Sequence, residues 1–366
     1  MKLHWPLAIF APIYGFAVWI RNKMFDWDIL KSEDFDIPVI SVGNISVGGT
    51  GKTPHIEYLI TLLSPEYRVA VLSRGYKRKS KGYVLAGDNT SADEIGDEPY
   101  QIKKKFPDIT VAVDADRRRG IRNLMSLKPQ IDVILLDDAF QHRYVNPLTS
   151  ILLTDYNRMF FDDALLPLGR LREPESAKYR ANIIIVTKCP DNIRPIDRRI
   201  LIKRLDLYPY QRLFFSSPAY GNLVPLYKKE ERGEILLKNI TQNARILAVS
   251  GIANPKPFDD YLRSTGARVE TMHFGDHHSF TKQDIKAIMQ NFLRMKAISS
   301  YTYIVITEKD AAKLIGKEIS EAIKDHIYVL PIKIKFSKCD GEAFNKCIKD
   351  TIYSNRRTRV KPNGYK

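Results

Sequence analysis

The sequence predicts an α/β fold with a mainly parallel sheet. Short apolar runs of strand length recur along the chain and alternate with segments whose apolar residues have helical spacing. The clearest case is residues 37–63, where an apolar run and a glycine-rich turn precede Ile56, Leu59, Ile60 and Leu63 at helical spacing. This order of strand, tight turn and helix is typical of parallel sheets.

The turn between this strand and this helix has the composition of a phosphate-binding P-loop. Its residues are Ser46, Val47, Gly48, Gly49, Thr50, Gly51, Lys52 and Thr53. Glycines let backbone N–H groups turn around an anion, and the following helix adds the positive end of its dipole. Lys52 can reach the terminal phosphates of a nucleotide, and the Thr53 hydroxyl can bind Mg²⁺. The usual motif has glycine at position 46, so a turn that binds nothing is the alternative.

Length and composition favour two globular domains and an anionic partner. The chain has 366 residues, with 44% hydrophobic and 27% charged side chains. Its 58 Lys and Arg exceed its 42 Asp and Glu by 16, which suggests nucleic acid, anionic lipid or a phosphorylated substrate. Cys189, Cys339 and Cys347 lack metal-site spacing and are interpreted as buried thiols in a reducing compartment.

Residues 5–20 contain no charged side chain and are followed by Arg21 and Lys23. The segment is shorter than the roughly 20 residues needed to cross a bilayer, and no small-residue cleavage site follows it. Tryptophans near both ends and basic residues beyond them favour a helix that lies in or on a membrane surface. A helix docked on the protein's own core is the alternative.

Acidic residues follow a second apolar run further along the chain. Residues 131–136 lead into Asp137 and Asp138, the Walker B pattern that places a carboxylate beside Mg²⁺. Arg172 and Glu173 lie in a segment bounded by prolines. Arginine can stabilise charge on a transferred phosphoryl group and glutamate can bind a metal, whereas a surface ion pair is the alternative.

Two further motifs have a structural explanation from their pattern alone. Asp97 precedes Pro99 by two residues, which predicts the start of a helix with Asp97 as its cap. His277 and His278 are adjacent, so their side chains point in different directions and form a poor metal pair.

The motifs SVGNISVGGTGKT, SRGYKR, GDEP, LLDDAFQH, LPLGRLREP, GIANP, GDHH and TEKDA occur in one order. Together they resemble the tetraacyldisaccharide 4'-kinase family, and the resemblance extends from the N-terminal apolar segment to about Lys335. Serine or threonine at position 46 is characteristic of that family. The resemblance implies transfer of the γ-phosphoryl group of ATP to the 4'-hydroxyl of a tetraacyldisaccharide 1-phosphate in lipid A biosynthesis.

The resemblance implies ATP and Mg²⁺ as cofactors and a role for each P-loop residue. Ser46 to Thr53 would surround the ATP phosphates, with Lys52 on the β- and γ-oxygens and Thr53 on Mg²⁺. Asp137 and Asp138 would form the acidic pair near the metal, in an order that the sequence leaves open.

Residues of four other motifs acquire roles in the same way. Glu173 corresponds to an additional metal-site glutamate, and Arg172 to a phosphate-facing arginine. Asp97 matches the catalytic aspartate, which would take the proton of the sugar hydroxyl, and His277 matches its partner histidine. Residues 307–310, TEKD, are expected near the nucleotide.

The family implies a P-loop NTPase-like domain, a second and smaller α/β domain, and a β-ribbon linker. The expected segments are a membrane-associating helix at 1–27, the kinase domain at 28–210, the ribbon at 211–228, the second domain at 229–350 and a mobile basic tail at 351–366. The expected location is the cytoplasmic face of the inner membrane. The expected partners are an anionic glycolipid and the membrane surface, without nucleic acid or an obligate protein partner.

A membrane-associated regulatory ATPase with a deviant Walker A loop is the competing class. Such proteins carry a signature lysine just before the paired glycines, where this chain has Val47, and they lack the GDEP and GRLREP motifs. A nucleic-acid-binding NTPase is a third possibility, supported by charge alone.

Overall fold

The computed structural model describes residues 10–227, 233–276, 278–315, 317–337 and 340–359. Contacts divide the chain into two compact units. The larger unit combines Met1–Pro218 with Ile334–Lys366, and the smaller unit is Ala219–Lys333. The predicted α/β fold with a mainly parallel sheet is confirmed, and so is a second, smaller α/β unit.

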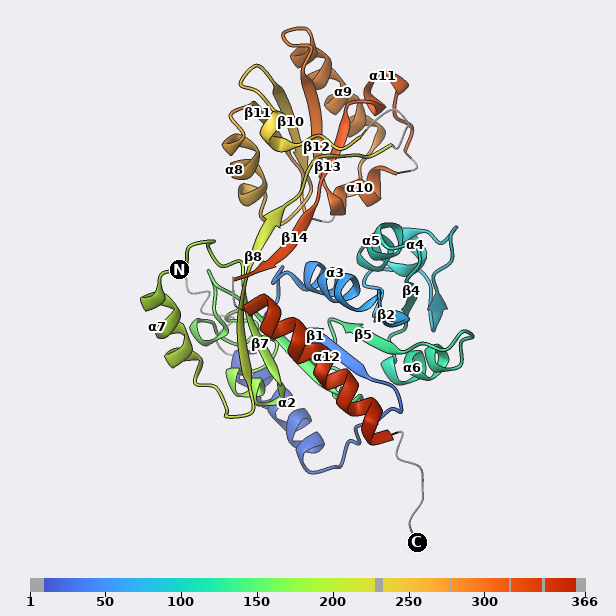
Figure 1. Ribbon diagram of the computed structural model, residues 1–366, viewed down its shortest axis with the longest axis vertical. Helices are drawn as coiled ribbons and strands as arrows, with labels where there is room; N and C mark the ends of the chain where they lie inside the picture. Colours follow the sequence, from blue (N-terminus) through green and yellow to red (C-terminus); the bar gives the residue numbers. More distant parts are fainter. Residues whose placement is uncertain (1–9, 228–232, 277, 316, 338–339, 360–366) are drawn as a thin grey trace. The chain divides into compact units, whose positions relative to one another are not determined.

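The larger unit is built on a nine-stranded sheet in the order β14-β8-β7-β6-β1-β5-β2-β4-β3 (Figure 1). Its strands are β1 Val39–Gly43, β2 Val69–Ser73, β3 Val84–Leu85, β4 Thr110–Val113, β5 Val133–Asp137, β6 Thr149–Asp155, β7 Ile183–Thr187, β8 Arg212–Tyr220 and β14 Ile332–Phe336. The pairs among β1, β2 and β4 to β8 are parallel, whereas β3 runs antiparallel to β4.

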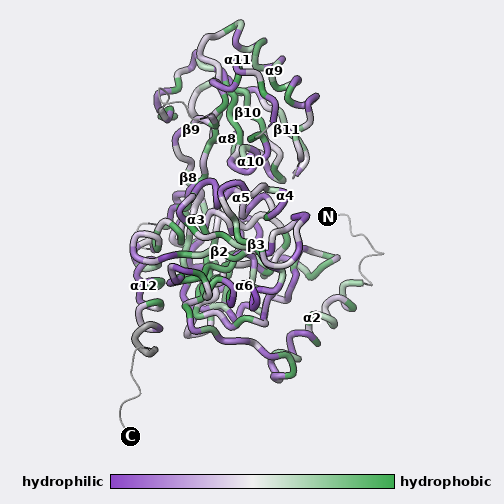
Figure 2. Tube along the Cα trace, turned by 90° about the vertical axis from the view of Figure 1, so that its right-hand side faces the viewer, coloured by the Kyte–Doolittle hydropathy of each residue, from purple (hydrophilic) through white to green (hydrophobic). Residues whose placement is uncertain are grey.

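Helices cover this sheet because its central strands are mostly apolar. Every residue of β1, β2, β5 and β7 is buried, as expected for parallel strands with both faces covered. Figure 2 shows the tube in the interior of this unit, around the label of β2, coloured as hydrophobic. The helices are α2 Phe10–Asp26, α3 Lys52–Leu63, α4 Ala92–Ile95, α5 Asp97–Lys105, α6 Arg117–Met125, α7 Pro195–Leu205 and α12 Asp340–Arg359, with short 3₁₀ helices at Phe160–Asp162 and Glu175–Arg180.

The smaller unit has a five-stranded sheet in the order β11-β10-β12-β13-β9. Its elements are β9 Val224–Pro225, β10 Arg245–Ser250, α8 Lys256–Ser264, β11 Arg268–His273, α9 Lys282–Lys296, β12 Thr302–Thr307, α10 Glu308–Leu314, α11 Glu321–Lys324 and β13 Ile327–Leu330, with a 3₁₀ turn at Leu237–Asn239. Only β9 is antiparallel to its neighbour among the pairs of the described strands. The alternation of strand and helix predicted for this half of the sequence is therefore present.

The C-terminal region differs from the boundaries expected at residues 350 and 351. Helix α12 continues through that position and belongs to the larger unit. Phe344, Ile348 and Ile352 are spaced four residues apart and are fully buried, so one face of the helix packs on the protein. The ring of Phe344 stacks on that of Phe336 at 4.6 Å between centroids. The high proportion of basic residues near the end of the helix concealed this apolar stripe.

The connection between the units involves more of the chain than the ribbon expected at residues 211–228. Residues 327–336 form two strands, β13 and β14, with Pro331 between them. Proline lacks the N–H that would continue a ladder. Strand β14 joins the larger sheet beside β8, and β9 pairs with β13 in the smaller sheet. The two strands that cross the unit boundary are therefore β8 and β14.

Replacement of Phe344 by alanine should lower the free energy of unfolding by about 3–5 kcal/mol, because it removes a buried ring from the contact between α12 and β14. Urea unfolding followed by circular dichroism measures the change. Lys346→Ala is the control, since Lys346 is exposed on the same helix and should change stability by less than about 0.5 kcal/mol. Equal effects of the two substitutions would contradict the packing described for α12.

Candidate nucleotide-binding site

The P-loop lies between β1 and α3, with Gly51 as the N-cap of the helix. Gly48 has φ +121° and Gly51 has φ +90°, values that favour glycine over residues with a side chain. The N–H of Thr50 donates to the carbonyl of Gly48 at 3.1 Å, which tightens the turn. A Cβ added at Gly48 or Gly49 would meet no atom within 4 Å, so the space over these glycines is open.

Backbone hydrogen bonds attach a distant segment to the P-loop. The N–H of Val47 donates to the carbonyl of Arg170, and the N–H of Arg172 donates to the carbonyl of Ile45, both at 2.7 Å. Ser46 and Leu171 form an antiparallel bridge between these bonds. The predicted loop and the predicted arginine are therefore neighbours, although more than 120 residues separate them in the sequence.

Asp138 is the centre of a cluster of opposite charges. Lys52 Nζ lies 3.6 Å from Asp138 Oδ1, and Arg172 Nη1 lies 3.1 Å from both carboxylate oxygens of Asp138. Burial alone would raise the pKa of Asp138, but Lys52 and Arg172 outweigh it and hold that pKa below its usual value. The structure thus brings together three of the residues that the sequence assigned to nucleotide chemistry.

The neighbouring Asp137 has a different environment. It is the last residue of β5 and is 2% exposed. Burial, then Glu98 and Asp138, raise its pKa to about 7, while Lys52 and Arg117 oppose the rise. Its Oδ2 accepts a long hydrogen bond of 3.5 Å from Ser73 Oγ. Its Oδ1 is buried without a hydrogen-bond partner among the described residues. Such a carboxylate oxygen can bind a cation.

Two charged residues near Asp137, Arg117 and Glu98, were missed by the sequence reasoning. Arg117 is 3% exposed and donates to the carbonyls of Asp114 at 3.0 Å and Ala115 at 3.2 Å. Burial lowers its pKa to about 10. The signal for it was the run DADRRRG, which directly follows a strand of the same parallel sheet.

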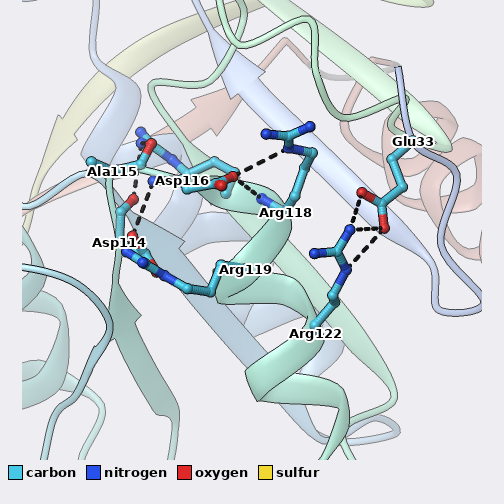
Figure 3. Close-up of polar contacts among 8 residues, drawn as sticks. Glu33, Asp114, Ala115, Asp116, Arg118, Arg119 and Arg122 are labelled. Atoms are coloured by element: carbon cyan, nitrogen blue, oxygen red, sulfur yellow. Dashed lines mark hydrogen bonds and ion pairs between the residues drawn. The ribbon is translucent and has the colours of Figure 1, made fainter. Parts of the chain in front are cut away.

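Carboxylates form ion pairs with the arginines that follow Arg117 along the chain (Figure 3). Asp114 accepts from Arg119 at 2.7 and 2.8 Å, and Asp116 accepts from Arg118. Arg122 binds both oxygens of Glu33. Among these arginines, Arg117 is the one whose charge acts mainly on the buried Asp137.

Asp97 is the first residue of α5 rather than its cap. The N-cap is Gly96, whose φ of +93° requires glycine. A Cβ at Gly96 would lie 2.9 Å from the carbonyl oxygen of Tyr76, so the SRGY and GDEP motifs are in close contact. Gln101 of α5 donates to Glu57 of α3 at 3.0 Å, so α5 packs beside the helix that follows the P-loop. The half-buried Asp97 is therefore on an element beside the nucleotide site.

Glu173 is held by an ion pair. It is 2% exposed and accepts from Arg180 Nη2 at 2.7 Å and from Asn22 Nδ2 at 3.0 Å. Within the described ranges, no group of three or more His, Cys, Asp or Glu side chains is arranged to hold a metal ion. A metal-binding role for Glu173 therefore stays a prediction.

In the smaller unit, the TEKD motif forms the start of helix α10 and connects it to β10. Thr307 is the N-cap of α10, and the buried Asp310 accepts from the N–H of Gly251 at 2.9 Å, which links α10 to the end of β10. His277 lies outside the described residues. Its neighbour His278 contacts Asp284 Oδ2 at 2.8 Å, so its ring is engaged at the start of α9.

Helix α2 has one face on the protein and another exposed. Tyr14 donates to the carbonyl of Arg172 and Arg21 to the carbonyl of Gln141, each at 2.9 Å, while Asn22 contacts Glu173. The exposed large apolar side chains of the helix are those of Phe10, Ile13, Phe16, Trp19 and Ile20. Among the helices of the described ranges, none combines the length and apolar character required to span a bilayer.

His142, in the loop after β5, should make stability depend on pH. Burial, together with Arg117, lowers its pKa to about 4, below the unfolded value near 6.5. The unfolded chain binds more protons between these values, so the free energy of unfolding falls as the pH falls from 7 to 5. His142→Gln should reduce this fall by about 1 kcal/mol in urea unfolding at the two pH values. An unchanged pH dependence would contradict the assignment.

Comparison with known proteins gives a consistent result. The family model for tetraacyldisaccharide-1-P 4'-kinase matches residues 3–353. A tetraacyldisaccharide 4'-kinase of Phocaeicola vulgatus is 52% identical over 348 residues, which cover 94% of each chain. The enzyme of that name from Bacteroides thetaiotaomicron is 51% identical over 365 residues, with 98% of this chain and 95% of the relative covered.

Among solved structures, LpxK from Aquifex aeolicus in complex with ATP matches with a TM-score of 0.72 and 30% identity. The match covers 94% of this chain and 98% of that one. Sequence and fold therefore agree over nearly the whole length, and the chain belongs to the tetraacyldisaccharide 4'-kinase family.

Proposed function

We propose that the chain transfers the γ-phosphoryl group of ATP to the 4'-hydroxyl of a tetraacyldisaccharide 1-phosphate in lipid A biosynthesis. Family membership over residues 3–353 supports the substrate and the reaction. The observation that carries the chemistry is the cluster in which Lys52 of the P-loop and Arg172 both contact Asp138. Two cations beside an open glycine turn can bind and stabilise a transferring phosphoryl group.

The residues present fit a nucleotide with a magnesium ion. Ser46 to Thr53 would surround the phosphates, and the hydroxyl of Thr53 with Asp137 and Asp138 would hold the metal. The buried and unpartnered Oδ1 of Asp137 supports this assignment. Magnesium, when bound, neutralises charge on the phosphate oxygens. Glu173 is a further candidate ligand of the metal ion.

Lys52 and Arg172 would change partners when ATP binds. In the structure both cations share the carboxylate of Asp138, at distances of 3.6 and 3.1 Å. Bound phosphates would compete for them, with Lys52 on the β- and γ-oxygens and Arg172 on the transferred group. Asp138 keeps the two side chains beside the loop, so less conformational entropy is lost on binding.

A general base completes the proposed reaction. Asp97 would accept the proton of the sugar hydroxyl, with His277 as the partner that orients and tunes it. The place of Asp97 in the first turn of α5, which packs beside the helix that follows the P-loop, supports this role.

The proposed location is the cytoplasmic face of the inner membrane, with the protein attached peripherally through α2. The exposed apolar side chains of α2 and the formal charge of +16 both suit an anionic lipid surface. The proposed partners are the anionic glycolipid and this surface. Neither nucleic acid nor an obligate protein partner is part of the proposal.

Incubation of the purified chain with γ-labelled ATP, Mg²⁺ and the disaccharide lipid tests the function directly. The label should appear on the 4' position of the distal sugar, as located by mass spectrometry of the product. Omission of the lipid should leave ATP essentially intact. Phosphate release without lipid phosphorylation would instead indicate an ATPase and overturn the proposal.

Asp97→Asn should lower kcat by roughly 10²- to 10⁴-fold and leave the KM for ATP nearly unchanged, because a general base acts in the transition state. The lipid assay at saturating substrates measures both constants. Asp93→Asn is the matched control, since Asp93 forms an exposed ion pair with Lys79 just before α5. Retention of near wild-type kcat by Asp97→Asn would exclude this residue as the base.

A double substitution of Phe16 and Trp19 by serine should weaken binding to anionic vesicles roughly tenfold or more, because two stacked and exposed rings no longer enter the lipid. Flotation with phosphatidylglycerol vesicles measures the bound fraction. Leu293→Ser, at an exposed apolar residue of α9, is the control and should bind normally. Normal vesicle binding by the double variant would contradict the anchoring role of α2.

A further inference from the structure

His55 is a buried histidine that the proposed chemistry leaves without a task. It lies in the first turn of α3, three residues after Lys52, and is 2% exposed. The ring is buried and its two nitrogens face a carbonyl oxygen and a hydroxyl, so the neutral imidazole with a single N–H fits these partners. A neutral imidazole can donate one hydrogen bond and accept another.

The partners of the ring decide which nitrogen carries the proton. Nδ1 lies 2.7 Å from the carbonyl oxygen of Gly51, and Nε2 lies 3.0 Å from Ser216 Oγ. A carbonyl oxygen can only accept, so Nδ1 donates to Gly51. Nε2 must then accept from the hydroxyl of Ser216. The chain of hydrogen bonds therefore runs in one direction, from Ser216 through His55 to Gly51.

The last acceptor in this series of hydrogen bonds is the carbonyl of Gly51 in the P-loop. Gly51 has φ +90°, caps α3 and directly precedes Lys52. The carbonyl of the preceding residue, Thr50, accepts from Thr187 Oγ1 at 2.9 Å. Side-chain hydrogen bonds thus hold two successive carbonyl groups of the loop. Because each peptide group is rigid, this restraint also fixes the direction of its N–H group. An anion site made of backbone donors depends on that direction.

The first donor in this series of hydrogen bonds lies on a strand that connects the two units. Ser216 is on β8, and the ring of Phe336 on β14 contacts the His55 ring edge-on, at 6.3 Å between centroids and 84° between planes. Both strands continue across the unit boundary. His55 is therefore in contact with the P-loop and with each connecting strand at the same time.

We propose that His55 is a positioning residue that makes ATP affinity depend on the Ser216 side chain of β8. The hydroxyl of Ser216 fixes the ring, and the ring fixes the Gly51 carbonyl and thereby the last peptides of the P-loop. This inference rests on the proposed binding of ATP at that loop. A histidine that served only the core would affect folding stability and leave ATP affinity unchanged.

Ser216→Ala provides the sharpest test, because it removes one hydroxyl at a distance from the nucleotide. Loss of one buried hydrogen bond corresponds to a rise of about three- to tenfold in the Kd for ATP. The Kd is measured by equilibrium dialysis with labelled ATP and Mg²⁺, and the KM for ATP in the lipid assay should rise in parallel while kcat stays within about twofold. Ser216→Thr keeps the hydroxyl and should retain most of the affinity.

Ser217→Ala is the matched control, since the hydroxyl of Ser217 is exposed on the next residue of the same strand and donates to the Lys335 carbonyl at 3.4 Å. Its Kd for ATP should equal that of the unaltered protein. His55→Phe should weaken binding at least as much as Ser216→Ala. The two substitutions combined should be no worse than His55→Phe alone, because they act in one chain of hydrogen bonds.

An unchanged Kd in Ser216→Ala, with only a lower unfolding midpoint in urea, would overturn the proposal and make His55 a core residue. Equal weakening by Ser216→Ala and Ser217→Ala would also overturn it. The dialysis measurement does not depend on the lipid reaction. A failure of the proposed kinase activity, seen as absence of labelled lipid with the unaltered protein, is therefore distinct from a failure of this inference.

Discussion

The pairing of residues 45–47 with residues 170–172 is the constraint on which the nucleotide site depends. Two backbone hydrogen bonds of 2.7 Å join these segments, and Arg172 reaches Asp138 because of them. The parallel sheet supplies the other half of the arrangement, since β1 and β5 are neighbours and end at the same edge. A loop, an arginine and two aspartates from three parts of the chain thus become one cluster.

The pKa values of the adjacent carboxylates in this cluster are shifted in opposite directions because their surroundings differ. Asp138 faces Lys52 and Arg172, which keep its pKa low, whereas Asp137 is enclosed by the sheet and faces Glu98. Arg117, supported through its contacts with Asp114 and Ala115, limits the cost of that burial. A cation at the free oxygen of Asp137 would lower its pKa by direct charge neutralisation.

Sequence alone predicted the parts of the fold that local patterns determine. The strands around the P-loop are mostly apolar runs, and the residues proposed to bind phosphate are contiguous, so periodicity and glycine spacing pointed to both. Arg117 and Glu98 were missed because their importance arises from contacts between distant elements. Helix α12 was missed because its apolar residues are diluted among charged ones, and β14 because its partner β8 lies more than 100 residues away.

The contacts of α2 with the larger unit have a consequence for the residues around Arg172. Asn22 covers the nearly inaccessible carboxylate of Glu173, and Tyr14 covers the main chain at Arg172. Trimming away the first 26 residues would open this ion pair to water and free the strand segment that carries Arg172. The helix is thus part of the packing around Arg172 and Glu173, and a shortened chain without it would lose these contacts.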